Sequence, residues 1–243
     1  MSEFQIIRKE LQALADPIKA RFLPRFFKTG PGEYGEGDRF LGVMVPNIRK
    51  VTRSHLQAAR RDILKLLRSP NHEERLTALL ILVEQYRRGD KARKKAIYDL
   101  YLANTEYINN WDLVDLTAPR IVGYHIYGKD VSVLTRLALS ESLWERRIAV
   151  LSTFWFIRCG EGGEALRIAG LLLRDKHDLI HKAVGWMLRE VGNRCSIEME
   201  RGFLDKHAAV MPRTMLRYAI ERFPEPLRKK YLTTKHTNNT KRT

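Results

Sequence analysis

The feature that most constrains the fold is a helix pair that recurs at nearly constant spacing. Helical periodicity dominates the 243 residues, and no convincing pair of strands interrupts it. The second helix of each successive pair is predicted to begin near Asn71, Asn110, Ser142, Asp178 and Pro212. These starts are separated by about 32 to 39 residues, which is typical of helical solenoids, where each pair buries its apolar face against its neighbours.

This period predicts an all-α fold, a curved solenoid of HEAT-like helical repeats that forms a single domain over residues 1–228. Weak local similarity agrees with it, because residues 75–78 (RLTA) and 146–149 (RRIA) fall on helices of the same rank. A compact, irregular helical bundle is the alternative. Residues 229–243 are polar and basic and end in KHTNNTKRT, so we predict a disordered tail there.

The charge of the chain narrows the choice of partner. Lysine and arginine number 44 against 28 acidic residues, which leaves a formal net charge of +16. An excess of this size indicates a polyanionic partner, with nucleic acid the first candidate and an acidic membrane surface the second. No apolar run reaches the roughly 18 residues that a membrane span needs. The first residues, MSEF, have no basic-then-apolar signal pattern.

Cysteine, histidine and glycine patterns argue against several kinds of site. Two scattered cysteines, Cys159 and Cys195, are neither a disulfide scaffold nor a metal site, and they indicate a reducing, cytoplasmic setting. Apart from His177 and His181, which stand four residues apart, the seven histidines are scattered, and there is no CxxC pair, so we expect no metal and no cofactor. Residues 29–38 (TGPGEYGEGD) fit neither a Walker A motif nor GxGxxG, so a connecting loop is favoured over a phosphate cradle.

The segment with the clearest chemical potential is residues 109–116, NNWDLVDL. An asparagine pair can cap a helix, and a helix that starts there places Trp111 and Asp115 on one face. The indole can hold a cation, and the carboxylate can stabilise a developing positive charge or orient a water molecule. The alternative is that Trp111 belongs to the core and Asp115 makes a structural ion pair.

Two further segments lie on the corresponding helices of the next repeats. In residues 144–147 (WERR), Arg147 is a candidate for binding a phosphate in bidentate fashion. The alternative is an arginine on a solvated face. Gly185, beside Trp186, costs a helix about 1 kcal/mol relative to alanine and therefore indicates close packing. Basic residues such as Arg49 and Lys50 recur along the chain and would line a basic groove if the repeats align them.

Four motifs in order resemble the bacterial DNA alkylation repair family, the AlkD-type DNA glycosylases: residues 40–49 (FLGVMVPNIR), 110–115 (NWDLVD), 144–147 (WERR) and 182–190 (KAVGWMLRE). The resemblance covers roughly residues 40–224. It implies a curved array of HEAT-like repeats and hydrolysis of the N-glycosidic bond of N3- and N7-alkylated purines in DNA. It also implies that Trp111 and Trp186 contact the lesion nucleotide, that Asp115 is the catalytic carboxylate, and that Arg147 contacts a backbone phosphate.

From the residues and the resemblance together we expect a monomeric, monofunctional glycosylase that acts on double-stranded DNA in the cytoplasm, near the nucleoid. Arg49, Lys50 and Arg189 are expected to add DNA contacts, and no deep nucleobase pocket is expected. The main alternative is a non-catalytic HEAT-like scaffold that binds nucleic acid through the basic groove. A protein-interaction module is a third possibility, but it gives no reason for the charge of +16.

Overall fold

The structure is a computed structural model and describes residues 1–237. Within this range all regular structure is helical, apart from one isolated bridge between Arg39 and Asn71. The prediction of an all-α fold is therefore confirmed. None of the helices among these residues is both long enough and apolar enough to cross a membrane.

The chain forms two compact units, Met1–Thr117 and Ala118–Thr243. The assignment of residues 1–228 to a single domain stays a prediction.

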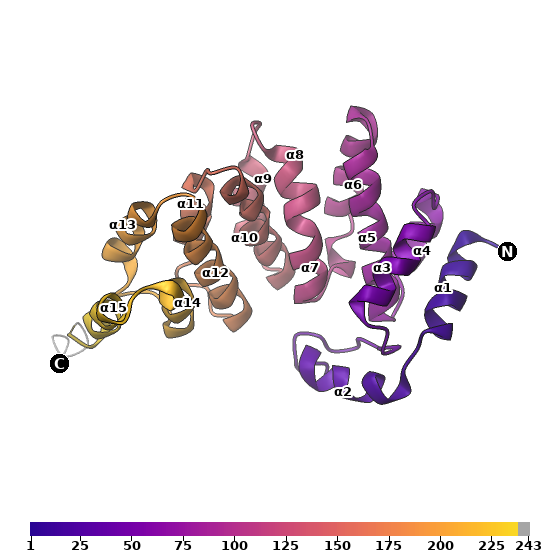
Figure 1. Ribbon diagram of the computed structural model, residues 1–243, viewed down its shortest axis with the longest axis horizontal. Helices are drawn as coiled ribbons and strands as arrows, with labels where there is room; N and C mark the ends of the chain where they lie inside the picture. Colours follow the sequence, from indigo (N-terminus) through magenta and orange to yellow (C-terminus); the bar gives the residue numbers. More distant parts are fainter. Residues whose placement is uncertain (238–243) are drawn as a thin grey trace. The chain divides into compact units, whose positions relative to one another are not determined.

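The first unit is built around one helix that is buried along most of its length. Its helices are α1 (Glu3–Ala13), α2 (Pro17–Phe27), α3 (Val45–Ser54), α4 (Arg60–Leu67), α5 (His72–Arg88), α6 (Lys91–Leu102), the 3-10 turn η1 (Thr105–Tyr107) and α7 (Trp111–Ala118). Helix α5 contacts α1, α3, α4 and α6, and these helices surround it in Figure 1. Almost every residue of α5 from His72 to Tyr86 is buried, including several charged ones, so polar partners must be supplied inside this unit.

Local capping explains where several of these helices begin. Ser2 forms a capping box with Gln5, and Asp16 accepts hydrogen bonds from the amides of the first turn of α2. Asp90 caps α6 in the same way, as its position before that helix predicts. Asn71 differs from the prediction, because its side chain makes no capping bond and instead donates to Glu74 Oε1 at 2.9 Å.

A buried carboxylate from α5 fixes the segment that leads into α3. Glu73 accepts hydrogen bonds from the amides of Leu41, Gly42 and Val43, at 3.0, 2.8 and 3.2 Å. Gly42 has a φ of 83° and passes so close to Asp16 that an added Cβ would lie 2.1 Å from the Asp16 carbonyl oxygen. The FLGV motif of residues 40–43 is thus held from both sides by this unit.

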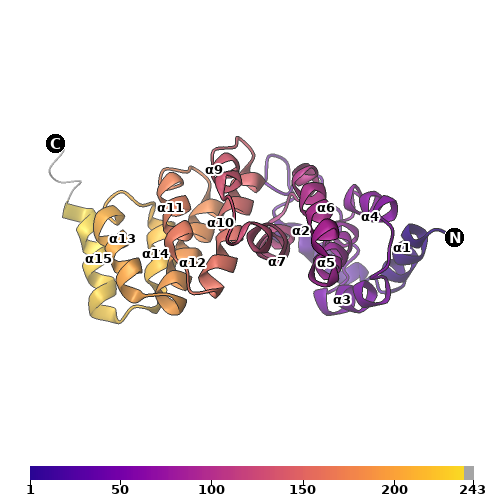
Figure 2. The same ribbon diagram turned by 90° about the horizontal axis from the view of Figure 1, so that it is seen from above.

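The second unit is a stack of helix pairs. It contains the π-helical turn η2 (Pro119–Gly123), α8 (Tyr124–Ile126), α9 (Ser132–Ala138), α10 (Leu143–Arg158), α11 (Gly163–Leu171), α12 (Asp178–Arg194), α13 (Ile197–His207), α14 (Arg213–Ala219), the 3-10 turn η3 (Ile220–Arg222) and α15 (Glu225–Thr237). The second helices α10, α12 and α14 contact one another in sequence, and the first helices α9 and α11 contact each other. Figures 1 and 2 show the same succession, which is the stacking that the helical period predicts.

Both ends of this unit are informative. At its start, Pro119 opens the π-helical turn that follows α7. At the other end, helix α15 continues through residues 229–237, where the sequence indicated a disordered tail. Tyr231 explains the difference, because its ring is buried and its hydroxyl donates to Asp205 Oδ1 at 2.9 Å. Residues 238–243, the rest of the predicted tail, lie outside the described range.

Close packing at Gly185 generates a stability prediction. A Cβ at this position would lie 2.4 Å from the Met215 carbonyl oxygen and 2.6 Å from Tyr218 Cβ. Because helix α14 would have to move, we predict that Gly185→Ala lowers the free energy of unfolding by about 1–3 kcal/mol. Gly170→Ala is the matched control, since that helical glycine has nothing within 4 Å of an added Cβ. It should stabilise the protein by about 0.4–1 kcal/mol. Urea unfolding measures both, and equal effects would contradict the role assigned to Gly185.

Candidate active site

Helix α7 begins at Trp111, as the asparagine pair predicts, and it separates its residues into two faces. Leu113 and Val114 are fully buried, and Asp112 is nearly so. Trp111 and Asp115 are instead half-buried, so both keep contact with solvent. One face of α7 therefore presents an indole and, one turn later, a carboxylate, while the opposite face is anchored in the core.

The indole of Trp111 is positioned by aromatic contacts. It stacks on Phe27, with ring centroids 5.3 Å apart and an angle of 13° between the planes. Phe26 meets it edge-on at 5.6 Å. Phe27 is buried and also stacks on Phe40 at 5.0 Å, whereas 63% of Phe26 is exposed. Trp111 is thus neither a core residue nor a loose surface residue, because one of its faces is fixed and its edge reaches solvent.

Behind this stack lies a buried ionic network centred on His72. The imidazole Nδ1 donates to Asp38 Oδ2 at 3.0 Å, and Nε2 donates to Asp112 Oδ2 at 2.9 Å. A histidine that donates from both ring nitrogens is an imidazolium cation. Burial alone would lower the pKa of His72, but the hydrogen bonds to Asp112 and Asp38 outweigh it and raise the pKa to about 9. Arg75 completes the network through an ion pair with Asp38.

This network attaches the start of α7 to two other parts of the first unit. Asp112 binds His72 at the start of α5, and Asn110 donates to Asp38 Oδ2 at 3.0 Å. Asp38 closes the glycine-rich loop of residues 29–38, so this loop acts as a structural connection. Sequence reasoning assigned none of these residues to the site and used His72 only as a helix start. One partial signal was present, since Asp112 stands between apolar residues that are typical of a core, and a buried carboxylate needs a cation.

A buried phenol lies on the other side of α7. The Tyr101 hydroxyl is 2.9 Å from Thr117 Oγ1, and Thr117 in turn donates to the Leu113 carbonyl oxygen. Burial raises the pKa of Tyr101, and the negative charge of Asp115 raises it further. Tyr101 therefore stays protonated, and Asp115 is the acidic group of this neighbourhood that faces solvent.

The structure places Arg147 inside the second unit. Only 5% of its surface is exposed, and Nη1 donates to the Leu179 carbonyl oxygen at 2.6 Å, which links α10 to α12. The adjacent Arg146 forms an ion pair with Asp175 at 2.6 Å. Arg147 is thus not an arginine on a solvated face, and its contact with a DNA phosphate stays a prediction.

Trp186 lies on α12 and is half-buried, with its indole Nε1 donating to Glu190 Oε1 at 3.3 Å. Phe154 of α10 lies beside it, with ring centroids 5.9 Å apart. Arg189 forms an ion pair with Glu221 and keeps 18% of its side chain exposed. Gly185 makes its close contact with α14 rather than directly beside Trp186.

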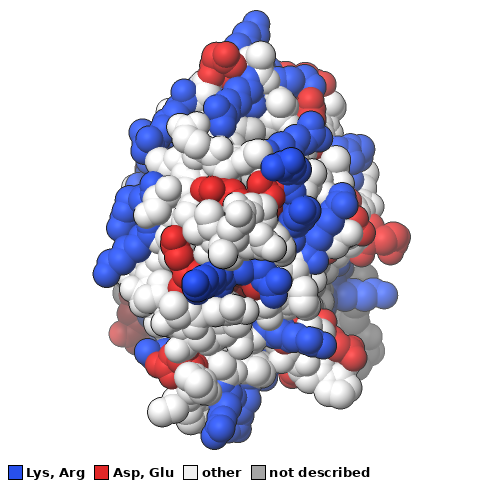
Figure 3. All heavy atoms as spheres, turned by 90° about the vertical axis from the view of Figure 1, so that its right-hand side faces the viewer, with Lys and Arg blue, Asp and Glu red and all other residues white. Residues whose placement is uncertain are grey.

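The remaining predicted DNA contacts lie on α3 of the first unit. Lys50 is exposed and Arg49 is half-buried. Figure 3 shows lysine and arginine side chains distributed over the viewed face with fewer acidic ones between them, and no single unbroken basic band is visible there. Trp111, Asp115, Arg49 and Lys50 belong to the first unit, whereas Arg147, Trp186 and Arg189 belong to the second. Their assembly around one lesion stays a prediction.

The His72 network generates a prediction about pH. The pKa of His72 is higher in the folded protein, about 9, than its ordinary value of 6.5. Its stabilising contribution is therefore complete below pH 6.5 and is lost as the pH rises through 9, and a shift of this size is worth on the order of 3 kcal/mol. We predict that the unfolding free energy of the wild type falls over this range and that His72→Gln removes much of that slope.

The measurement is urea unfolding at several pH values for the wild type, for His72→Gln and for a control variant, His207→Gln. His207→Gln is the control, because His207 is half-buried against Phe203, with ring centroids 4.6 Å apart, and has no carboxylate partner among residues 1–233. The control should retain the wild-type slope. An unchanged slope in His72→Gln would show that the imidazolium is not the group that titrates.

Among known protein families, the sequence model of one described as DNA alkylation repair enzyme matches residues 7–223. A solved structure, a predicted DNA alkylation repair enzyme from Enterococcus faecalis, shares the fold with a TM-score of 0.66. The similarity covers 87% of this chain and 97% of that chain, at 14% sequence identity. No curated protein matches the sequence. Since the family match spans most of its length, the chain belongs to the family of DNA alkylation repair enzymes.

Proposed function

We propose that this protein is a monofunctional DNA glycosylase that hydrolyses the N-glycosidic bond of cationic N3- and N7-alkylated purines in duplex DNA. Family membership supports a role in the repair of alkylated DNA. The observation that carries the specific proposal is the different use of two acids on α7. Asp112 is buried and bound to His72, whereas Asp115 is half-buried, accessible to solvent and on the same helical face as Trp111.

The chemistry suits these residue types. Alkylation at N3 or N7 gives the purine a formal positive charge and makes it a good leaving group, so little or no general acid is needed, unlike at an ordinary glycosidic bond. Two tasks remain, which are to stabilise the oxocarbenium-like sugar and to position water. An ionised Asp115 can perform both. Opposite charges about 4 Å apart attract by about 4 kcal/mol at an effective dielectric constant of 20, worth about three decades in rate.

Trp111 and Trp186 are the proposed contacts to the lesion nucleotide. Each indole can contribute about 0.5–2 kcal/mol to binding a cationic nucleotide through its aromatic face. Phe27 stacks on Trp111 and Phe154 lies beside Trp186, so both rings are supported from one side. We propose that the lesion is held in an open groove, without deep base flipping, and that bulky adducts are therefore tolerated.

The charge of +16 supports double-stranded DNA as the partner. Lys50 and Arg49 on α3 and Arg189 on α12 are the proposed phosphate contacts with some exposure. Arg147, whose Nη1 donates to the Leu179 carbonyl oxygen, is also proposed to contact a backbone phosphate. We propose that the protein works as a monomer, in the cytoplasm and near the nucleoid.

The central test is release of free base from duplex DNA that carries N7-methylguanine or N3-methyladenine. We predict that wild type releases the base and that Asp115→Asn loses about two decades or more in rate, because the amide cannot stabilise the sugar cation. Asp99→Asn is the matched control, since this exposed acid on α6 forms an ion pair with Lys95 at 2.6 Å. It should retain the wild-type rate.

The rival function gives the opposite result. A non-catalytic scaffold gains nothing from an acid in its groove, so neither wild type nor Asp115→Asn would release base. Binding of undamaged duplex would remain salt-dependent and would be equal or tighter in the variant. This outcome would leave Trp111 and Asp115 with structural roles only.

A second prediction concerns the fate of the abasic site. No lysine stands beside Trp111 or Asp115 in sequence that would form a Schiff base with the sugar. We therefore predict simple hydrolysis with no strand cleavage by the enzyme. Borohydride added during turnover should trap no covalent protein–DNA adduct, and a lyase-competent glycosylase serves as the positive control. A trapped adduct would contradict the monofunctional assignment.

A further inference from the structure

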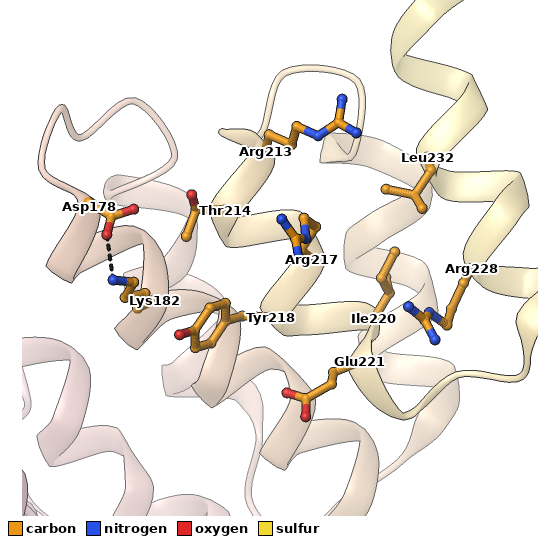
Figure 4. Close-up of a pocket in the computed structure, with 10 residues that line it drawn as sticks. All are labelled: Asp178, Lys182, Arg213, Thr214, Arg217, Tyr218, Ile220, Glu221, Arg228 and Leu232. Atoms are coloured by element: carbon orange, nitrogen blue, oxygen red, sulfur yellow. Dashed lines mark ion pairs between the residues drawn. The ribbon is translucent and has the colours of Figure 1, made fainter.

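A basic pocket lies in the second unit, apart from the α7 residues assigned to chemistry. It is formed by α12, α14, η3 and α15 and has a volume of about 620 Å³. Figure 4 shows Arg213, Arg217 and Arg228 around this hollow, with Asp178 and Lys182 on the side away from Arg228. Neither Trp186 nor any residue of α7 lines it.

The charges in this pocket do not cancel. Its two carboxylates are each held by a cation, because Asp178 pairs with Lys182 at 2.6 Å and Glu221 pairs with Arg189. The three arginines are exposed, and none of them has an acidic partner among residues 1–233, whose side chains the structure describes. Three guanidinium groups around one hollow repel each other, so the site favours an anion that several of them can share.

The geometry of the pocket is built into the fold rather than left to flexible surface side chains alone. Helix α14, which carries Arg213 and Arg217, is held against α12 by the close contact at Gly185. Arg213 and Arg217 are four residues apart on that helix and therefore share a face. Tyr218 borders the same pocket with 37% of its surface exposed and offers a phenolic donor.

Planar guanidinium groups with a neighbouring hydroxyl match the oxygens of a phosphate diester. We propose that this pocket binds a backbone phosphate of duplex DNA, at a contact point separate from the residues that act on the lesion. The proposal rests on the proposed function for its choice of DNA. Arg217 and Arg228 are the central ligands, and Arg213 adds charge at the rim.

A contact of this kind has a specific kinetic consequence. The phosphate it binds is not part of the reacting nucleotide, so the interaction is equally strong before and during bond cleavage. Such uniform binding lowers KM and leaves the rate at saturation to the groups around the lesion. The pocket therefore sets how firmly DNA is held rather than how fast the base leaves.

The test compares two double variants that remove the same charge from the same unit. Arg217→Gln with Arg228→Gln alters the pocket, and Arg136→Gln with Arg174→Gln removes two exposed arginines that do not line it. Anisotropy titration with a short undamaged duplex over a range of salt concentrations gives the slope of log K against log salt. We predict that the slope of the pocket variant is smaller in magnitude by about 1 and that this variant binds the duplex about tenfold more weakly. The affinity of the control variant should change by less than about twofold.

Equal losses in the two double variants would overturn the proposal, because they would show a dependence on net charge and not on the pocket. Unfolding curves establish that each variant is folded. If only the pocket variant melts early, Arg228→Lys provides a second test, since it keeps the charge but not the planar fork and should bind duplex more weakly than wild type. Wild-type affinity in Arg228→Lys would also overturn the proposal.

Two further measurements distinguish this proposal from the proposed function and from binding of free phosphate. Binding of undamaged duplex does not need catalysis, so the pocket is tested even if the wild type releases no base. Where base is released, the pocket variant should change KM more than kcat. Inorganic phosphate at constant ionic strength distinguishes the two sources of a phosphate ligand. If phosphate protects the wild type against unfolding and the pocket variant keeps its duplex affinity, the site binds free phosphate. This result would overturn the DNA contact.

Discussion

The candidate site depends on one buried interaction, the imidazolium of His72 between the carboxylates of Asp38 and Asp112. A buried charge is costly alone, but here each carboxylate offsets the desolvation of the cation and the cation offsets theirs. Because the three groups come from α5, the glycine-rich loop and α7, their mutual attraction fixes where α7 starts. The orientation of Trp111 and Asp115 follows from that start, since they stand one turn apart on the same face of the helix.

The aromatic stack extends the same constraint toward the surface. Phe40 stacks on His72 with ring centroids 4.9 Å apart, and the Phe27 ring lies 4.8 Å from the imidazole, so two aromatic rings pack against the cation. Phe27 then supports Trp111. A ring that would bind a cationic nucleotide is in this way attached through packed groups to the buried His72 imidazolium. Rigidity of this kind favours catalysis that needs a fixed carboxylate more than a mobile one.

Sequence reasoning reached the helices and the α7 face because both follow from local rules. Apolar periodicity, the asparagine pair before α7 and the four-residue spacing of Trp111 and Asp115 need no knowledge of distant contacts. The His72 network could not be derived in that way, because its residues are far apart in sequence and their pairing depends on tertiary packing. Arg147 shows the same limit, since nothing local reveals that its guanidinium turns inward to the Leu179 carbonyl oxygen. Helix α15 continues through a polar segment because Tyr231 is buried, and this tertiary contact cannot be read from the local sequence.

The proposed chemistry gives the two acids of α7 different uses. An enzyme that cleaves a stable glycosidic bond needs an acid with a raised pKa beside a second carboxylate. A cationic purine removes that requirement, because the lesion itself supplies the good leaving group. The second acid of α7 is then free for structural use, and Asp112 is used in that way against His72. On this argument the choice of lesion lies in the weakness of the charged bond, and binding residues elsewhere need only hold the duplex against the one accessible carboxylate.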